Sequence, residues 1–193
     1  MNIKRPISKQ PLPKSARRAY RGKIFDIYQW PVRGYDGKTY VFEKVKRPDT
    51  ALIVPVTNDG QIILCKQEQP GKKQFISIPA GRIDKNETPL QGAKRELLEE
   101  TGYKAGKWVL FEAAQPVSKV EWAIYTFIAK NCHKVSAQNL DGGEKIKPFL
   151  VSFNKFVSMV LDDKINEPGL KIRFLEAGQD PVKMNKIKKI FVP

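Results

Sequence analysis

Three glutamates at helical spacing could bind a divalent cation together. Glu96, Glu99 and Glu100 share one face of a helix at roughly 100° per residue. Three carboxylates on one face repel each other, and a protein keeps such a cluster most readily when divalent cations neutralise it. Because carboxylates offer only oxygen ligands, they suit Mg²⁺ or Mn²⁺. The cluster therefore predicts a metal site, with a merely solvated acidic face as the alternative.

The helix that must position these glutamates has clear start and stop signals. Thr88 is a hydroxyl N-cap, Pro89 suits the first helical position, and Gln91 at N3 completes a capping box. Gly102 supplies the left-handed residue that ends a helix. These signals predict a helix over Pro89–Thr101. A neighbouring apolar face can pack on a sheet: Leu90, Ala93 and Leu97.

The glutamates lie within a longer run of residues at fixed spacing. Five residues separate Gly81 from Glu87, and seven separate Glu87 from Arg95. Arg95 lies four residues before Glu99 and can pair with it, which would hold a ligand carboxylate in place. The run ends at Gly102. So many positions in register favour the metal-site interpretation over a solvated helix face.

This run resembles the Nudix box, G-x5-E-x7-R-E-U-x-E-E-x-G-U, in which U is apolar. Tyr103 occupies the last, loosely apolar place. The order of elements is similar to the branch that includes ADP-ribose pyrophosphatases and nucleoside diphosphate sugar hydrolases. The resemblance covers approximately residues 23–177 and is strongest over residues 79–103.

The resemblance implies a set of catalytic residues. In that branch, glutamates of the box and a loop carbonyl hold the metal ions that bridge the diphosphate and activate a water. The matching metal ligands here are Ala80, Glu96, Glu99 and Glu100. Glu144 matches the carboxylate that accepts the proton of the water, with Glu96 as the alternative base. The structural residues of the box would be Gly81, Glu87, Arg95 and Gly102, with Glu87 bonding the loop to Arg95.

The resemblance also implies a substrate class, namely a nucleoside diphosphate linked to a sugar, such as ADP-ribose. Hydrolysis would give a nucleoside monophosphate and a sugar phosphate. Ser77 stands where the branch commonly has glutamate, and Gln69 where it has arginine, so the substrate within the class stays open. Candidate substrate contacts are Trp30, Tyr28 and Arg47, with core or dimer packing as the alternative for the two aromatic residues.

The charge of the chain favours an anionic ligand. The 193 residues carry a formal net charge of +15, and Lys and Arg are concentrated in the first 50 residues. Such a field attracts polyanions and speeds the capture of a phosphorylated substrate. It does not distinguish a small nucleotide from nucleic acid. Two alternatives therefore stay open, an RNA 5′-end pyrophosphohydrolase and a non-catalytic RNA-binding protein of the same fold.

The order of elements indicates an α/β class, an α/β/α sandwich with a mixed sheet. Alternating residues around a turn at Asp36-Gly37 predict a small antiparallel unit before it. Such a unit is marginal alone, so we expect a homodimer through it. The expected parts are a basic, partly disordered arm (1–22), the antiparallel unit (23–47), the main domain (48–178) and a basic tail (179–193).

Individual elements follow from apolar runs. The predicted strands of the main domain lie at 51–56, 61–67, 75–81, 108–114, 121–130 and 144–153, and later helices at 154–164 and 169–178. The basic tail from 181 has no predicted state. The start of the sequence lacks the apolar core of a signal peptide and no segment could span a membrane. We therefore expect a cytoplasmic protein with no membrane partner.

Overall fold

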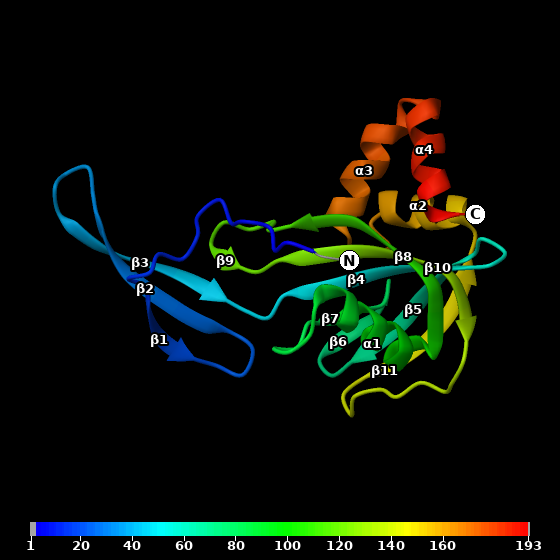
Figure 1. The fold of residues 1–193 in the computed structure, drawn as a ribbon, viewed down its shortest axis with the longest axis horizontal. Helices are drawn as coiled ribbons and strands as arrows, with labels where there is room; N and C mark the ends of the chain where they lie inside the picture. Colours follow the sequence, from blue (N-terminus) through cyan, green and yellow to red (C-terminus); the bar gives the residue numbers. More distant parts are fainter. Residues whose placement is uncertain (1–2, 193) are drawn as a thin grey trace.

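The computed structural model describes residues 3–192 and contains two β-sheets and four helices. In Figure 1 the smaller sheet lies at the left, away from the helices. The larger sheet lies at the right, with α1 below it and the other three helices above it. This arrangement confirms the predicted α/β/α sandwich with an additional antiparallel unit.

The smaller sheet is built mainly by the N-terminal part of the chain. Its strands, in sheet order, are β1 (Arg17–Arg21), β2 (Asp26–Arg33), β3 (Thr39–Lys46) and β9 (Val120–Glu121). β2 and β3 form the predicted hairpin, and Gly37 in its turn has a φ of 78°, which glycine adopts without steric penalty. β1 lies within the segment predicted as a basic arm, so part of that arm is a strand.

The larger sheet has seven strands, and its topology is mixed as predicted. They are β4 (Thr50–Thr57), β5 (Ile62–Gln69), β6 (Lys72–Ser77), β7 (Ala80–Arg82), β8 (Tyr103–Ala114), β10 (Ile124–Lys134) and β11 (Lys145–Val151). The main path runs β11-β5-β4-β10-β8, while β6 pairs with β5 and β7 with β4. β4 and β10 run parallel, and the other pairs are antiparallel.

Two predicted strands are each divided in the structure. The run 75–81 becomes β6 and β7, because Pro79 between them has no N–H to donate to a sheet. The run 121–130 becomes β9 and β10, because the Ala123 N–H donates to the Asp49 side chain at 2.8 Å instead of to a neighbouring strand. The first interruption lies next to Ala80, which is bonded to Glu100 of α1, and the second lies between β9 of the smaller sheet and β10 of the larger one.

Helices cover both faces of the larger sheet. α1 (Pro89–Thr101) packs Ala93 and Leu97 against one face. The other face carries α2 (Phe153–Leu161), α3 (Pro168–Gly178) and α4 (Pro181–Phe191). Their phenylalanines meet in one cluster with ring centroids 5.5 to 6.3 Å apart, within the range of favourable aromatic contact. The cluster consists of Phe153, Phe156, Phe174 and Phe191.

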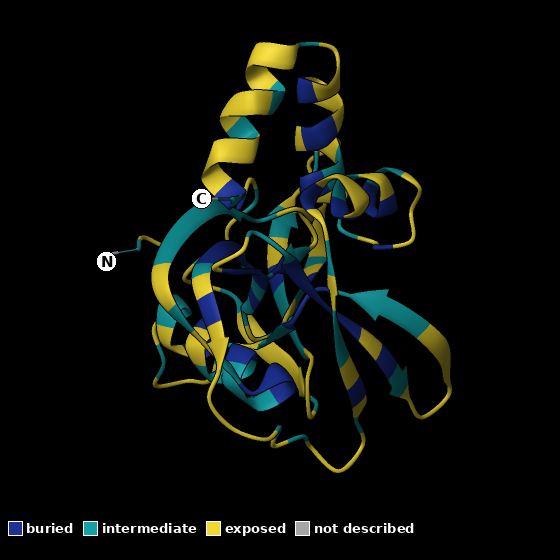
Figure 2. Ribbon diagram, turned by 90° about the vertical axis from the view of Figure 1, so that its right-hand side faces the viewer, coloured by how far each residue is buried: buried dark blue, intermediate teal, exposed yellow. Residues whose placement is uncertain are grey.

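The C-terminal tail, which had no predicted state, forms α4 and docks on the sheet. The Asp180 side chain accepts the Val182 N–H at 2.9 Å and so caps the helix. Phe191 is fully buried, and its ring centroid lies 5.4 Å from that of Phe111. The outer faces of α3 and α4 are exposed (Figure 2). Within the described residues, no helix is long and apolar enough to cross a lipid bilayer.

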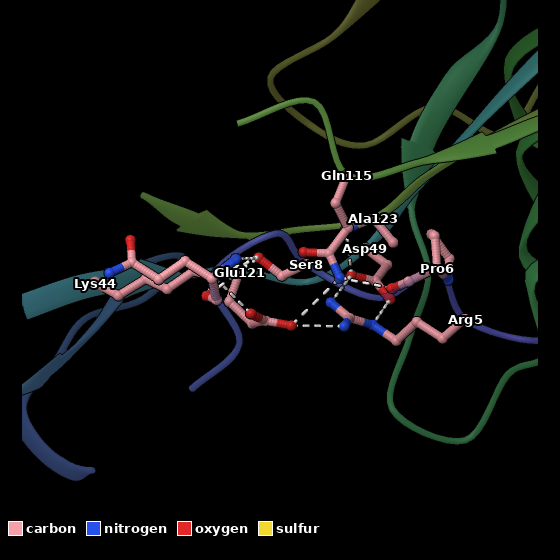
Figure 3. Close-up of polar contacts among 9 residues, drawn as sticks. Arg5, Pro6, Ser8, Lys44, Asp49, Gln115, Glu121 and Ala123 are labelled. Atoms are coloured by element: carbon pink, nitrogen blue, oxygen red, sulfur yellow. Dashed lines mark hydrogen bonds and ion pairs between the residues drawn. The ribbon is translucent and has the colours of Figure 1, made fainter. Parts of the chain in front are cut away.

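A partly buried ion network joins the two sheets (Figure 3). The Lys44 side chain is fully buried, and its ammonium donates to Glu121 Oε2 and to Ser8 Oγ, each at 2.8 Å. Arg5 donates to the other oxygen of Glu121 at 2.6 Å and to both oxygens of Asp49 at 2.8 and 3.0 Å. Because Asp49 precedes β4 and Glu121 lies in β9, the network ties the N-terminal segment to both sheets.

Replacing Glu121 with glutamine should lower the free energy of unfolding by about 3 kcal/mol or more, because it leaves the buried Lys44 ammonium without its counter-charge. Urea denaturation measures this loss. The matched control is Glu176→Gln, which removes an exposed partner of Arg173 and should change stability by less than about 1 kcal/mol. Equal stability of the Glu121 variant and the wild type would show that the network contributes nothing net.

Candidate active site

The helix α1 has the bounds and caps that the sequence predicts. The Thr88 side chain accepts the Gln91 N–H, and the Gln91 side chain accepts the Thr88 N–H, which completes the capping box. Gly102 ends the helix with a φ of 74°, and its N–H donates to the Leu98 carbonyl at 2.8 Å. A Cβ at Gly102 would overlap with the Ser136 carbonyl oxygen. This glycine therefore ends the helix and admits the loop that precedes β11.

Gly81 makes room for one of the predicted metal ligands. A Cβ at this position in β7 would overlap with the Glu96 carboxylate. The Glu96 carboxylate therefore lies directly against the backbone of β7. Burial raises its pKa above the ordinary range, although the bond from Arg95 opposes the shift. Any larger residue at Gly81 would displace this carboxylate.

Arg95 holds three glutamates at once. Its Nε and Nη2 donate to the two carboxylate oxygens of Glu87 at 2.8 and 3.0 Å, a bidentate pair. Its Nη1 donates to Glu96 at 2.7 Å and to Glu99 at 3.0 Å. Nη2 also donates to the Arg82 carbonyl at 2.9 Å, which ties the loop after β7 to the helix. Glu87 thus bonds the loop to Arg95, in the geometry that was predicted.

Glu100 is a strongly buried member of the acidic cluster, with only 4% of its surface exposed. The Ala80 N–H donates to its Oε2 at 3.2 Å. Burial, and after it the charge of Glu96, together raise the pKa of the Glu100 carboxyl to about 9. A carboxylate in this setting is ionised at neutral pH when a cation lies beside it. The Ala80 carbonyl stays a predicted ligand.

The loop before β11 brings Glu144 to the same end of α1. The Gln138 side chain donates to the Glu100 carbonyl, and the Asn139 N–H donates to the Glu99 carbonyl at 2.9 Å. After burial, the charge of Glu144 contributes to the raised pKa of both Glu96 and Glu100, so Glu144 is within electrostatic range of them. Its own pKa is raised, mainly by burial. Glu144 and the helix glutamates therefore form one acidic cluster.

This acidic cluster fits a divalent cation in its chemistry. Among residues 3–192, no group of three or more His, Cys, Asp and Glu side chains is already arranged to hold a metal ion, and Arg95 bonds to two of the glutamates instead. The cluster offers only oxygen donors, which suit Mg²⁺ or Mn²⁺. Its like charges raise the pKa of Glu100, and a cation there would relieve that repulsion.

A basic cleft of about 820 Å³ adjoins the box loop that follows β7. Residues 82–85, which follow Gly81 in the box, form part of its wall. Of the three predicted substrate contacts, Arg47 lines this cleft, whereas Trp30 and Tyr28 do not. Trp30 is largely buried against Phe42 of β3, at a ring-centroid distance of 6.0 Å, so it packs within the smaller sheet.

Most cations of this cleft were missed in the sequence, because they come from segments far apart in the chain. The missed cations are Arg5, Arg18, Arg21, Lys23, Lys46, Arg82 and Lys85. For the five that lie in the first 50 residues, the only signal is the excess of Lys and Arg there, and Arg82 and Lys85 lie outside it. That excess has no spacing from which a common site could be inferred.

Known proteins resemble this chain in part. An ADP-ribose pyrophosphatase of Bacillus subtilis (strain 168) is 42% identical over 89 residues, which are 46% of this chain and 48% of that protein. A methanol dehydrogenase activator of Bacillus methanolicus is 28% identical over 150 residues, 76% of this chain and 80% of that protein. The chain therefore spans about half the length of the first relative.

Solved structures and family comparison agree with the architecture. A crystal structure of an ADP compounds hydrolase matches with a TM-score of 0.67 and 21% identity, covering 91% of this chain and 98% of that chain. This likeness establishes the fold. The NUDIX domain family matches residues 46–171, well over half of the chain and the whole of the box that Arg95 holds together. The chain therefore belongs to the Nudix family.

Proposed function

We propose that this Nudix protein is a Mg²⁺-dependent pyrophosphohydrolase that splits a nucleoside diphosphate linked to a sugar. Hydrolysis of ADP-ribose or a related nucleoside diphosphate sugar would give a nucleoside monophosphate and a sugar phosphate. The observation that carries the proposal is that one box loop serves both sites, since residues 82–85 line the basic cleft and the Arg82 carbonyl accepts a bond from Arg95, which also holds Glu96 and Glu99. Similarity to the ADP-ribose pyrophosphatase of Bacillus subtilis supports the substrate class.

In the proposed reaction, a water oxygen attacks one phosphorus of the diphosphate and the bridging P–O bond breaks. The leaving phosphate keeps the bonding electrons. Mg²⁺ held by Glu96, Glu99 and Glu100 would neutralise phosphate charge and lower the pKa of the water. Glu144 would accept the proton of the water, because its loop is bonded to the last turn of α1 and burial raises its pKa. Arg95 would keep the glutamates aligned without touching the substrate.

A substrate assay tests the proposal. With Mg²⁺, the purified protein should hydrolyse ADP-ribose or another nucleoside diphosphate sugar faster than NADH, dinucleoside polyphosphates or triphosphorylated RNA. Chromatography of the products should show a nucleoside monophosphate and a sugar phosphate, and EDTA should abolish turnover. Faster turnover of triphosphorylated RNA would replace the proposal with an RNA 5′-end pyrophosphohydrolase.

The matched variant for this assay is Glu100→Gln, which should lower kcat/KM by at least about 10²-fold at saturating Mg²⁺. Its fold should survive. Between the ordinary pKa of 4.5 and the folded pKa of about 9, the metal-free protein loses stability as pH rises, because only the folded state keeps the Glu100 proton. Glutamine removes this loss, so the Tm in EDTA at pH 8 should not fall. Near-normal turnover would remove Glu100 from the metal site.

Glu144→Gln should lower kcat by about 10²-fold or more and leave KM for the diphosphate nearly unchanged, because a proton acceptor acts in the transition state. Steady-state kinetics separates the two effects. Glu68→Gln is the matched control, since Glu68 pairs with the neighbouring Lys145 at 3.0 Å and should not affect kcat. A rise in KM with unchanged kcat would make Glu144 a binding residue, and Glu96 would then be the base.

We also propose that the protein is a homodimer through residues 23–47. No helix covers the smaller sheet in Figure 1. The sheet carries a groove of about 420 Å³, in which four apolar residues lie among three charged ones: Ile27, Val41, Phe42 and Val45, with Glu43, Lys44 and Lys119. Val41 is 69% exposed, which is unusual for a valine in the middle of a strand. A second copy of the chain would cover these apolar residues.

Light scattering at tens of micromolar, on the order of the concentration at which an obligate dimer stays intact, should give twice the chain mass of 22.0 kDa. Val41→Lys should shift the protein towards the monomer, because it places a charge in the covered groove. Val182→Lys is the matched control, since Val182 is similarly exposed on α4 and should leave the dimer intact. A monomeric wild type would contradict the proposal.

A further inference from the structure

The basic cleft holds more positive charge than its own acids can neutralise. Eight Lys and Arg side chains and four Asp and Glu side chains line it. All four acids are already paired with three of the cations, since Arg5 pairs with Asp49 and Glu121, Arg18 with Asp26, and Arg82 with Asp84. The cations that form no ion pair within residues 3–192 are Arg21, Lys23, Lys46, Arg47 and Lys85.

Arg47 is held in place before any ligand binds. Its guanidinium carbon lies 4.5 Å from the ring centroid of Trp122 and 5.8 Å from that of Phe25. Its backbone N–H donates to the Glu121 carbonyl at 3.3 Å. Its Nε is buried and has no hydrogen-bond partner. Because Nε is closed off from solvent, a ligand in the cleft would bind the outer nitrogens of the guanidinium, which form no ion pair within residues 3–192.

The surplus charge exceeds what a diphosphate at the acidic cluster requires. In the proposed function, that diphosphate is neutralised by the cation bound to Glu96, Glu99 and Glu100. The unpaired cations of the cleft include Lys85, from the box loop, and Arg47, from the end of β3. They therefore line a space that begins at the box and extends away from it. The unpaired cations of the cleft would therefore neutralise a phosphate other than the diphosphate that the reaction cleaves.

The lining favours a compact nucleotide over an RNA strand. The cleft has a volume of about 820 Å³, which is in the usual range for one nucleotide-sized ligand. Proteins that bind single-stranded RNA combine a basic groove with aromatic side chains on which successive bases stack. The residues that line this cleft include no aromatic side chain. Trp122 lies behind Arg47, which covers its ring.

We propose that this cleft recognises a further phosphate on the nucleoside, a phosphomonoester on the ribose that lies outside the diphosphate being cleaved. The preferred ligands are then nucleotides with a phosphorylated ribose. The inference has two forms. The binding form, that such nucleotides bind the cleft, does not depend on the proposed hydrolase function, whereas the substrate form, that they are the preferred substrates, rests on it. Arg47 is the central contact, because its guanidinium is held against the Trp122 ring, and because the residue lines the cleft and forms no ion pair within residues 3–192.

Calorimetric titration in EDTA tests the binding form. Adenosine 2′,5′-bisphosphate should bind at least about 10-fold more tightly than AMP or ADP, as expected for one charge-assisted contact. ADP controls for charge alone, because its second phosphate is not on the ribose 2′ position. Arg47→Gln should remove the preference. Lys85→Gln, in an exposed loop where the fold is not at risk, should reduce it.

The matched controls are Lys186→Gln and Lys189→Gln on the exposed face of α4, which lie outside the cleft and should keep the full preference. Equal affinity for the bisphosphate, AMP and ADP would overturn the inference. So would a preference that survives both cleft variants, or tighter binding of a short single-stranded RNA with no ribose phosphomonoester.

Turnover separates this inference from the proposed function. The kcat/KM for 2′-phosphorylated ADP-ribose should exceed that for ADP-ribose by about 10-fold, and Arg47→Gln should equalise the two. Equal kcat/KM values in the wild type would overturn the inference and leave the hydrolase function standing. If neither compound is hydrolysed but the bisphosphate preference persists in EDTA, the hydrolase function is wrong and the recognition by the cleft stands.

Discussion

Arg95 is the residue on which the rest of the site depends, because it holds carboxylates together that would otherwise repel one another. Its bidentate bond to Glu87 fixes the loop after β7, and its bonds to Glu96 and Glu99 fix two glutamates of the helix. The position of these carboxylates also constrains the residues around them. Gly81 lacks a side chain because the Glu96 carboxylate occupies that space. The loop before β11 is bonded to the last turn of α1, which brings its own carboxylate to the cluster.

The acidic cluster and the basic cleft carry charges of opposite sign, and each is held by a different part of the fold. The acidic cluster belongs to the larger sheet and α1. The basic cleft takes its wall from both sheets, and the ion network of Lys44, Glu121, Arg5 and Asp49 keeps those sheets in one relative position. In the proposed function, a metal ion held by the acidic cluster would neutralise the diphosphate, and the side chains of the cleft would neutralise a further phosphate.

Much of the candidate site was accessible from the sequence, and the physical reason is locality. The caps of α1, the bond from Glu87 to Arg95 and the role of Gly102 all involve residues within about four helical turns of one another. The ends of the strands were harder to predict from the sequence. Pro79 and the bond from Ala123 to Asp49 each interrupt a strand that the apolar pattern alone extends. The docking of α4 through Phe191 depends on a pocket that three other elements build.

The sequence by itself determined the fold class, the glutamate-bearing helix and the family, because capping, helical periodicity and the fixed spacing of the box are properties of a short stretch of chain. Only the tertiary structure decided which distant residues share the cleft. Arg21, Arg47 and Lys85 become neighbours through the pairing of strands and the ion network between the sheets, and no spacing in the sequence encodes that proximity. Tertiary packing likewise buried Trp30, because its ring meets Phe42 across the hairpin.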